Sequence, residues 1–308
     1  MTEGATFKKI QDALRALQPV LERRRRKYRR RLVLGVTAIV LAVTAWVILT
    51  PYSRFDMPMV ATISGALIPC VIYYHILSHF YRTRGKKIFL NEFSQAISFT
   101  YKEDGLFNLS TVSAHKIIPP CNRESIEDGF DGEYNGVRIA LQEVNLDDLE
   151  RDPQNKNRTR EMPVFSGLFV RLTVRKPFEG HTVIMPNNAL LTWFRTKFSE
   201  FQKIKLVAPK FEKLYDVMGT DQVESRVIMN PAFIERFMQA GEILRARYME
   251  VSFLANEILL AVARSQPLFE YDPLWQKVTT ERLHKKVADI ETVMQLVDIL
   301  KLNRQTGA

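Results

Sequence analysis

The chain has 308 residues, 46% of them hydrophobic, and a formal net charge of +10. At roughly 150 residues per domain this length predicts about two folding units, and the composition excludes a collagen-like or largely disordered chain. Two cysteines, Cys70 and Cys121, are too few for the disulfide framework of a small secreted protein. The positive charge is uneven, because residues 1–87 carry +12 and the other 221 residues carry −2. Nucleic acid is therefore not an expected partner.

The first 31 residues have the pattern of a basic amphipathic helix. Apolar residues recur three or four apart along one face, at Phe7, Ile10, Leu14, Leu17 and Leu21. This stripe indicates either packing against the rest of the chain or pairing between subunits. A basic run follows, and its cations are the expected contacts for anionic lipid headgroups: Arg23, Arg24, Arg25, Arg26, Lys27, Arg29, Arg30 and Arg31.

Two charge-free runs follow the basic segment. Residues 32–49 would cover roughly 27 Å as a helix, and residues 57–77 would cover roughly 31 Å, both close to the thickness of a bilayer core. We expect two transmembrane helices joined by a short outside loop at 50–56. Because the basic flanks lie before the first run and after the second, both termini should be cytoplasmic. The alternative is a pair of buried helices.

Residues 78–278 predict a cytoplasmic α+β domain. A helix over 88–101 is followed by a hairpin over 129–141, in which Asn135-Gly136 is typical of a type I′ turn. Further strands are expected over 164–175 and 180–186.

The second half of this domain alternates helix and strand signals. The pattern predicts a helix over 193–201, and a strand with its exit over 206–211. A helix over 231–246 should begin with an Asn230 cap. A second hairpin should pair residues 248–254 with 257–263. Residues 279–308 predict a C-terminal amphipathic helix and tail, with apolar residues at Leu283, Val287, Ile290, Met294 and Val297.

The overall pattern is α+β, with mixed helices and antiparallel strands, and it lacks the regular strand–helix alternation of a nucleotide-binding sheet.

This layout resembles the bacterial family of domain of unknown function 3137. The local likeness lies in four segments: Phe165–Val170, Phe211–Val217, Thr220–Arg226 and Ser252–Ile258. The resemblance implies a two-span anchor in the bacterial inner membrane with a cytoplasmic α+β domain. It implies no catalytic residue, because the family has no assigned activity.

The densest polar group in a segment that looks folded consists of Asp216, Asp221, Glu224 and Arg226. Two of these carboxylates could act as an acid/base pair or bind a metal. The competing interpretation is structural, with Asp221 capping a helical turn and Arg226 pairing with a carboxylate. His75 and His79 stand four apart, but two imidazoles are too few for a metal site. No metal or cofactor is expected.

Three functional hypotheses follow. The first is a non-enzymatic membrane protein whose cytoplasmic domain binds a protein partner or forms a homo-oligomer as a scaffold. The second is a membrane-tethered hydrolase that uses the carboxylates at 216–224. The third is an anionic-lipid sensor built on residues 7–31.

Overall fold

The computed structural model describes residues 3–49, 59–117, 121–151, 159–187, 192, 194–195, 197–265, 267 and 269–299. These residues divide into two compact units. One unit combines residues 97–269 with the chain from 286 onward, and the other combines residues 2–96 with 270–285. The predicted loop at 50–56 and the tail after 299 lie outside the described residues.

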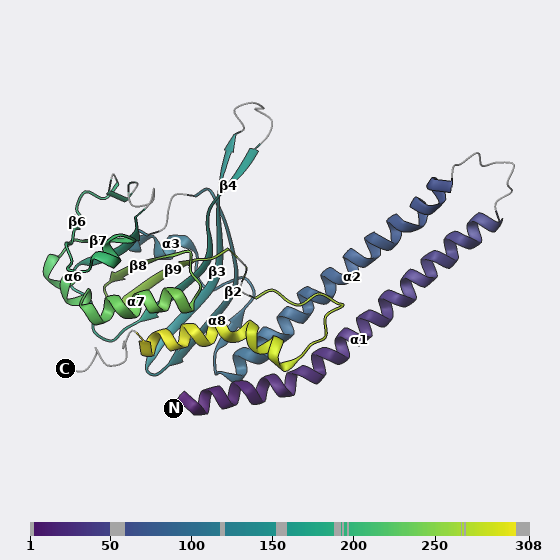
Figure 1. The fold of residues 1–308 in the computed structure, drawn as a ribbon, viewed down its shortest axis with the longest axis horizontal. Helices are drawn as coiled ribbons and strands as arrows, with labels where there is room; N and C mark the ends of the chain where they lie inside the picture. The colour runs from purple at the N-terminus through teal and green to yellow at the C-terminus, as the bar shows by residue number, and fades with distance from the viewer. Residues whose placement is uncertain are drawn as a thin grey trace. The chain divides into compact units, whose positions relative to one another are not determined.

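The first unit is built on one antiparallel sheet of nine strands in the order β1-β2-β3-β4-β9-β8-β5-β7-β6 (Figure 1). The strands are β1 (Thr100–Lys102), β2 (Arg123–Tyr134), β3 (Val137–Arg151), β4 (Thr159–Thr173), β5 (His181–Pro186), β6 (Gln202–Lys203), β7 (Tyr215–Gly219), β8 (Tyr248–Leu254) and β9 (Glu257–Ala263). The fold class is therefore α+β, as the sequence predicted.

The two predicted hairpins are present, and the residues at their turns have the backbone conformations that tight turns require. Asn135 and Gly136 both have positive φ, at 49° and 80°, and join β2 to β3 as a type I′ turn requires. Ala255 has φ 51° between β8 and β9, whose bounds match the predicted hairpin. Gly167 lies where β4 meets β9, and an added Cβ there would overlap the carbonyl oxygen of Val262.

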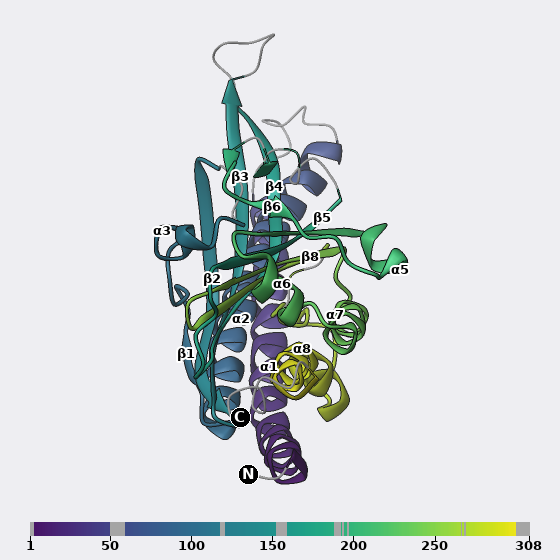
Figure 2. The same ribbon diagram turned by 90° about the vertical axis from the view of Figure 1, so that its left-hand side faces the viewer.

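Alternate residues of the central strands face two different layers. One face carries the main apolar cluster, which includes Phe169, Val183, Met218 and Leu259. The opposite face packs against α7 (Pro231–Ile243), where the Phe233 ring lies 5.7 Å from Phe253 of β8. Figure 2 shows α6 (Gln222–Ile228) and α7 on one side of the strands and α3 (Leu109–Val112) on the other.

Three predicted elements differ from the structure or lie partly outside the described residues. The helix expected over 88–101 ends at Ala96, and Thr100–Lys102 forms β1. No strand covers 206–211, because α5 (Pro209–Glu212) begins there with a proline in its first turn. The helix expected over 193–201 falls partly on residues outside the description.

The second unit contains two long helices, α1 (Glu3–Leu49) and α2 (Met59–Ala96). Their tyrosines Tyr28 and Tyr81 pack 5.5 Å apart between ring centroids. Tyr73 donates a hydrogen bond to the carbonyl oxygen of Arg31 at 3.0 Å, beside Gly35, where an added Cβ would overlap the Tyr73 ring. The predicted stripe at Ile10, Leu14, Leu17 and Leu21 is buried, which favours packing within the chain.

The predicted transmembrane pair is corrected by the structure. Among the described residues, no helix combines the length and apolar character needed to cross a bilayer. This finding overturns the spans at 32–49 and 57–77 and the multi-pass location in the bacterial inner membrane. The prediction treated each charge-free run as a separate helix, whereas residues 32–49 and 59–77 are parts of the longer helices α1 and α2, which also carry basic segments.

The C-terminal helix α8 (Thr280–Ile299) lies inside the range predicted for it. Its apolar face is buried, at Leu283, Val287, Ile290, Met294 and Val297.

Candidate functional site

An apolar groove in the sheet-containing unit is the candidate site. One wall is the segment that follows β6. Its path is fixed by two hydrogen bonds: Ile204 N donates to the carbonyl oxygen of Val217 at 2.8 Å, and Leu206 N donates to Glu212 Oε1 at 3.0 Å. Pro209 then starts α5. Because this segment forms a bend instead of a strand, Val207 remains fully exposed, and Leu206 and Ala208 remain partly exposed.

The other wall is the N-terminal half of α7. Asn230 caps the helix by accepting a hydrogen bond from Phe233 N at 3.0 Å, and Pro231 occupies the first turn. Phe233 and Phe237 point to the core and are buried. A second row on the same helix faces the groove, at spacings of three, one and three: Pro231, Ile234, Glu235 and Met238.

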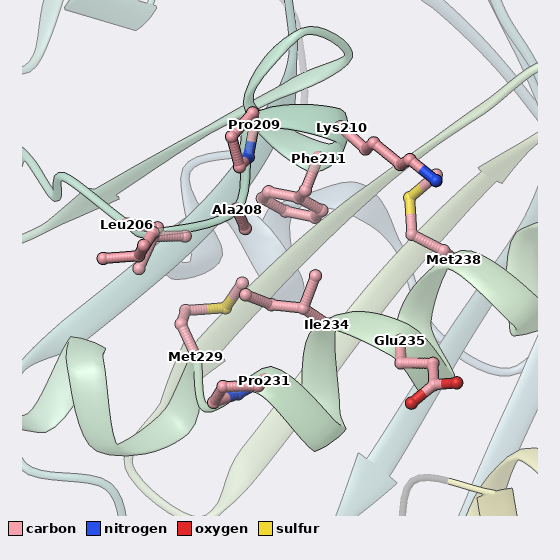
Figure 3. Close-up of a pocket in the computed structure, with 11 residues that line it drawn as sticks. Leu206, Ala208, Pro209, Lys210, Phe211, Met229, Pro231, Ile234, Glu235 and Met238 are labelled. Carbon is pink, nitrogen blue, oxygen red and sulfur yellow. The ribbon is translucent and has the colours of Figure 1, made fainter.

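The groove has a volume of about 720 Å³ (Figure 3). In Figure 3 Phe211 and Ile234 reach into the space between the walls, while the carboxylate of Glu235 points away from it. Behind the groove the ring of Phe211 packs 5.4 Å from Tyr215 and 5.9 Å from Phe237. The full lining is Leu206, Val207, Ala208, Pro209, Lys210, Phe211, Met229, Pro231, Ile234, Glu235 and Met238.

The rim of the groove is charged unevenly. Lys210 lines the groove on the loop wall, and Lys205 and Lys213 flank the lining segment 206–211 in the sequence; all three are exposed, and none has an ion-pair partner among the described residues. The carboxylate on the same wall, Glu212, is already engaged by the Leu206 N–H. Glu235 is the exposed acid on the helix wall. The loop side of the groove is therefore positive.

The predicted acid/base residues do not line this groove, and those with a hydrogen bond or ion pair have structural partners. Asp216 of β7 is 2% exposed, and its carboxylate pairs with Arg195 and with Lys203 Nζ, the latter at 2.8 Å. It faces the same side of the sheet as Met218, in the apolar cluster. The groove lies on the opposite side, where Tyr215 packs against Phe211.

Asp221 is the N-cap of α6. Its Oδ1 accepts hydrogen bonds from Val223 N and Glu224 N, both at 2.8 Å. Arg226 Nη2 donates to Gln222 Oε1 one turn earlier on the same helix, at 3.1 Å. The capping interpretation of Asp221 thus matches its geometry, whereas Arg226 pairs with an amide, not with a carboxylate. The four predicted residues do not converge on one point.

A buried polar network, which the sequence analysis missed, lies on the cluster face of the sheet. Ser252 Oγ lies 3.0 Å from His115 Nδ1 and 2.8 Å from His181 Nε2. On its other side, His115 Nε2 lies 3.4 Å from Glu257 Oε2. Ser252, His115 and His181 are all at most 7% exposed. No sequence signal could reveal this group, because His115, His181 and Ser252 are separated from one another by 66 to 137 residues and have no motif spacing.

The network is consistent with two neutral imidazoles. His181 Nε2–H can donate to Ser252 Oγ, whose hydroxyl donates to His115 Nδ1, leaving His115 Nε2–H to face Glu257. Burial lowers the pKa of His181 to about 4, and the positive charge of Lys116 adds to this effect. Burial also lowers the pKa of His115, against the opposing influence of Glu257. With Ser252 Oγ enclosed, the network ties the turn after α3 to the sheet.

Glu250 is a second buried polar group on this face. It is 1% exposed, and neither carboxylate oxygen has a hydrogen-bond partner among the described residues. Burial raises its pKa to about 8. A carboxyl group in this environment is neutral near pH 7.

The predicted lipid-contact cations are not equivalent in the structure. Arg25 is 2% exposed, because its guanidinium binds Glu22 at 2.6 Å and the carbonyl oxygen of Leu274 at 3.3 Å. Arg24 and Arg31 lie over the ring of Tyr28, at 5.4 and 5.6 Å. The remaining members of the run are exposed: Arg23, Arg26, Lys27, Arg29 and Arg30.

Glu22 is the centre of a hydrogen-bond network that joins α1 to the segment around Val278 within the helical unit. Its Oε2 accepts hydrogen bonds from Arg25 Nε at 2.8 Å and from Val278 N at 3.1 Å. Gln18 Nε2 donates to the carbonyl oxygen of Val278 at 2.9 Å. The Arg25 hydrogen bond is the main reason that the pKa of Glu22 falls to about 2.

Metal ligands do not gather within the described part of the chain, where no cluster of three or more His, Cys, Asp and Glu could hold an ion. The predicted pair His75 and His79 instead makes ring contacts with aromatic neighbours, His75 with Tyr74 at 5.5 Å and His79 with Phe80 at 6.1 Å.

Comparisons with known proteins identify a family and one distant fold. Residues 163–302 match the family model described as protein of unknown function (DUF3137). No curated protein matches the chain. Among solved structures, the crystal structure of the mycobacterial trehalose monomycolate transport factor A, TtfA, is similar at 8% identity and a TM-score of 0.37, covering 70% of this chain and 97% of that chain. A likeness this weak carries no argument about function.

Proposed function

We propose that this chain, which belongs to the DUF3137 family, is a non-enzymatic module that binds a protein partner. The partner would bind in the groove between the 206–211 loop and α7. The family description itself states no function. The observation that carries this proposal is the groove itself, with its volume of about 720 Å³ and its mostly apolar lining. Val207 at its edge is fully exposed. Apolar residues gathered at an open surface typically mark an interaction site.

The partner contact should centre on Ile234 and on Met238, one turn later on α7, while Met229 also lines the groove but is only 3% exposed. Methionine is flexible and polarisable, so it adapts to side chains of different shapes. Ile234 is half-buried, and replacement by a charged residue there should weaken binding while the core residues Phe233 and Phe237 stay in place.

Site-specific photocrosslinking in cells tests this function. A benzoylphenylalanine in place of Val207 should form an adduct with a partner, and a second substitution, Ile234→Glu, should abolish it. The same crosslinker in place of Lys176, an exposed residue on the connection between β4 and β5, is the matched control. Equal adducts from positions 207 and 176, or adducts unaffected by Ile234→Glu, would contradict the proposal. An adduct between two copies of the chain would identify the partner as a second copy of this protein, so that the groove mediates homo-oligomer formation.

A second candidate function is contact with an anionic lipid surface through the basic segment of α1. The supporting observation is that Arg23, Arg26, Lys27 and Arg30 are exposed at spacings of three, one and three, which places them in one row on the helix. Each such cation adds about 1 kcal/mol of attraction near an anionic leaflet. This contact requires no helix to cross the bilayer.

Vesicle cosedimentation tests the second function. The full chain should bind vesicles containing phosphatidylserine more tightly than neutral vesicles, and salt should weaken the preference. The double variant Arg26→Gln/Arg30→Gln should lose most of it, whereas the control Arg175→Gln/Lys176→Gln in the sheet unit should keep it. Equal binding to both vesicle types would end this idea.

A further inference from the structure

We propose that the occupant of the groove is an amphipathic helix of the partner protein, whose apolar face is flanked by carboxylates on the side that meets the lysine-bearing loop. This inference rests on the proposed protein-binding function and names the chemistry of the partner. It has three independent supports: the shape of the helix wall, the supply of backbone hydrogen-bonding groups, and the charge on the rim.

The helix wall presents a row that suits a second helix. Pro231, Ile234 and Met238 recur along one face of α7, opposite the ring of Phe211. Grooves that bind an amphipathic helix read anchors at this same three- and four-residue spacing. The unbranched side chains of Met229 and Met238 can adjust to the anchors of the incoming helix.

Backbone groups on the two walls argue against an extended peptide. The N–H groups of Ile204 and Leu206 are already used by Val217 O and Glu212 Oε1. Pro209 and Pro231 have no N–H to offer. A peptide bound as a strand needs free backbone partners along its length, and these four positions offer no free N–H. A helix satisfies its own backbone hydrogen bonds internally, so it loses nothing in this groove.

The charge on the rim sets the flanks of the partner helix. Lys205, Lys210 and Lys213 are exposed and without an ion-pair partner among the described residues, and all three lie within or directly beside the segment that forms the loop wall. Lys210 lines the groove directly. Carboxylates on the adjoining flank of the partner helix would meet this positive side, which improves the association rate and the choice of partner.

Binding of designed peptides to the full chain tests the inference. Three labelled 18-residue probes of equal length are compared by fluorescence anisotropy: a helix with a Leu/Met face and Glu flanks, the same face with Lys flanks, and a scrambled form of the Glu peptide without an apolar face. The Glu-flanked helix should bind at least tenfold more tightly than either of the others. The advantage over the Lys-flanked helix should shrink as salt is raised, because screening weakens charge pairs.

Charge reversal locates the contact. The triple variant Lys205→Glu/Lys210→Glu/Lys213→Glu should reverse the preference between Glu and Lys flanks. The control Arg175→Glu/Lys176→Glu changes two exposed cations on another loop of the same unit and should leave the preference unchanged. Far-ultraviolet circular dichroism and a thermal unfolding curve establish that each variant is folded.

The outcomes separate this inference from the proposed function. If position 207 crosslinks a partner and Ile234→Glu abolishes the adduct, the binding role stands whatever the peptides do. Absence of binding by the Glu-flanked helix, or equal binding by its scrambled form, overturns the helix as occupant. Equal or tighter binding by the Lys-flanked helix overturns the acidic flank. A reversal seen equally in the Arg175/Lys176 control would show that net charge, and not the groove, sets the preference, which also overturns the inference.

Discussion

His181 Nε2 lies 2.8 Å from Ser252 Oγ in the interior of the sheet, so β5 and β8 are joined by side chains as well as by their backbone ladder. His115 Nδ1 meets the same oxygen from the turn after α3, at 3.0 Å. One hydroxyl group therefore contacts two buried imidazoles, and its removal leaves His181 Nε2 and His115 Nδ1 without this hydrogen-bond partner.

Ser252→Ala should destabilise the protein by about 1–3 kcal/mol, because a buried polar group that loses its hydrogen bond retains its full desolvation cost. Denaturant unfolding followed by tryptophan fluorescence measures the effect. The exposed residue Ser110 provides the control variant Ser110→Ala, which should change stability by less than about 0.5 kcal/mol. Equal effects of the two variants would show that the network adds nothing to the fold.

Because of Glu250, the free energy of unfolding should depend on pH between about 4.5 and about 8. Its pKa is about 8 in the folded chain and 4.5 ordinarily, so the native state keeps a proton that the unfolded chain releases. Stability should therefore fall as pH rises from about 4.5 to about 8, by about 1.4 kcal/mol for each pKa unit of difference.

The variant Glu250→Gln tests this dependence, since the amide cannot ionise. Unfolding free energies of the parent and the variant are measured at pH 5, 7 and 9. The decline between pH 5 and pH 9 should be much smaller in the variant. Parallel curves for the two proteins would show that Glu250 does not cause the decline.

Glu22 has the opposite sign. Its pKa is lowered from 4.5 to about 2, so the stability that it contributes is present above pH 4.5 and is lost as pH falls through about 2. At pH 7 Glu22→Gln should cost about 3–5 kcal/mol, because Arg25 is left buried without its counter-charge.

Two further variants isolate the ion pair. Glu22→Gln/Arg25→Met removes both charges and should recover part of the lost stability, measured by thermal unfolding at pH 7. Glu92→Gln changes an exposed acid on α2 and should have little effect. If the double variant is no more stable than Glu22→Gln, the unpaired charge of Arg25 is not the cause of the loss.

Asp221→Ala should destabilise the protein by about 0.5–2 kcal/mol through loss of the α6 cap, and Asp221→Asn should restore most of that loss because asparagine also caps well. Chemical denaturation at pH 7 measures both variants. A hydrolase role predicts a different pattern, in which Asp221→Asn removes a cellular phenotype without a loss of stability, and that result would revive the carboxylate hypothesis.

The sequence predicted the parts of the fold that local chemistry determines. Asn135-Gly136 and the Asn230–Pro231 start of α7 appear where their backbone preferences require. The 248–254 and 257–263 hairpin was predicted to the residue. The order of the nine strands was not predicted, because pairs such as β4 with β9 depend on contacts between distant segments.

The groove was missed for a local reason. The apolar run at 206–211 was interpreted as a strand and its exit, whereas Pro209 starts a helical turn and no strand precedes it within this range. The polar network was beyond sequence reasoning, since His115, His181 and Ser252 become neighbours only when three separate segments fold together. The prediction of two membrane spans rested on the number of consecutive uncharged residues. It was wrong, because no helix among the described residues is both long enough and sufficiently apolar to cross a membrane.

Gly167 has a consequence for the whole sheet. It lies at the seam where the four-strand meander from β1 to β4 meets the five remaining strands through β9. Even a methyl group at this position would collide with the Val262 carbonyl oxygen. The continuity of the sheet therefore depends on the absence of a Cβ atom at residue 167. The substitution Gly167→Ala would force β4 and β9 apart at this point. The side chains packed on both faces of the sheet would then lose their common backbone support.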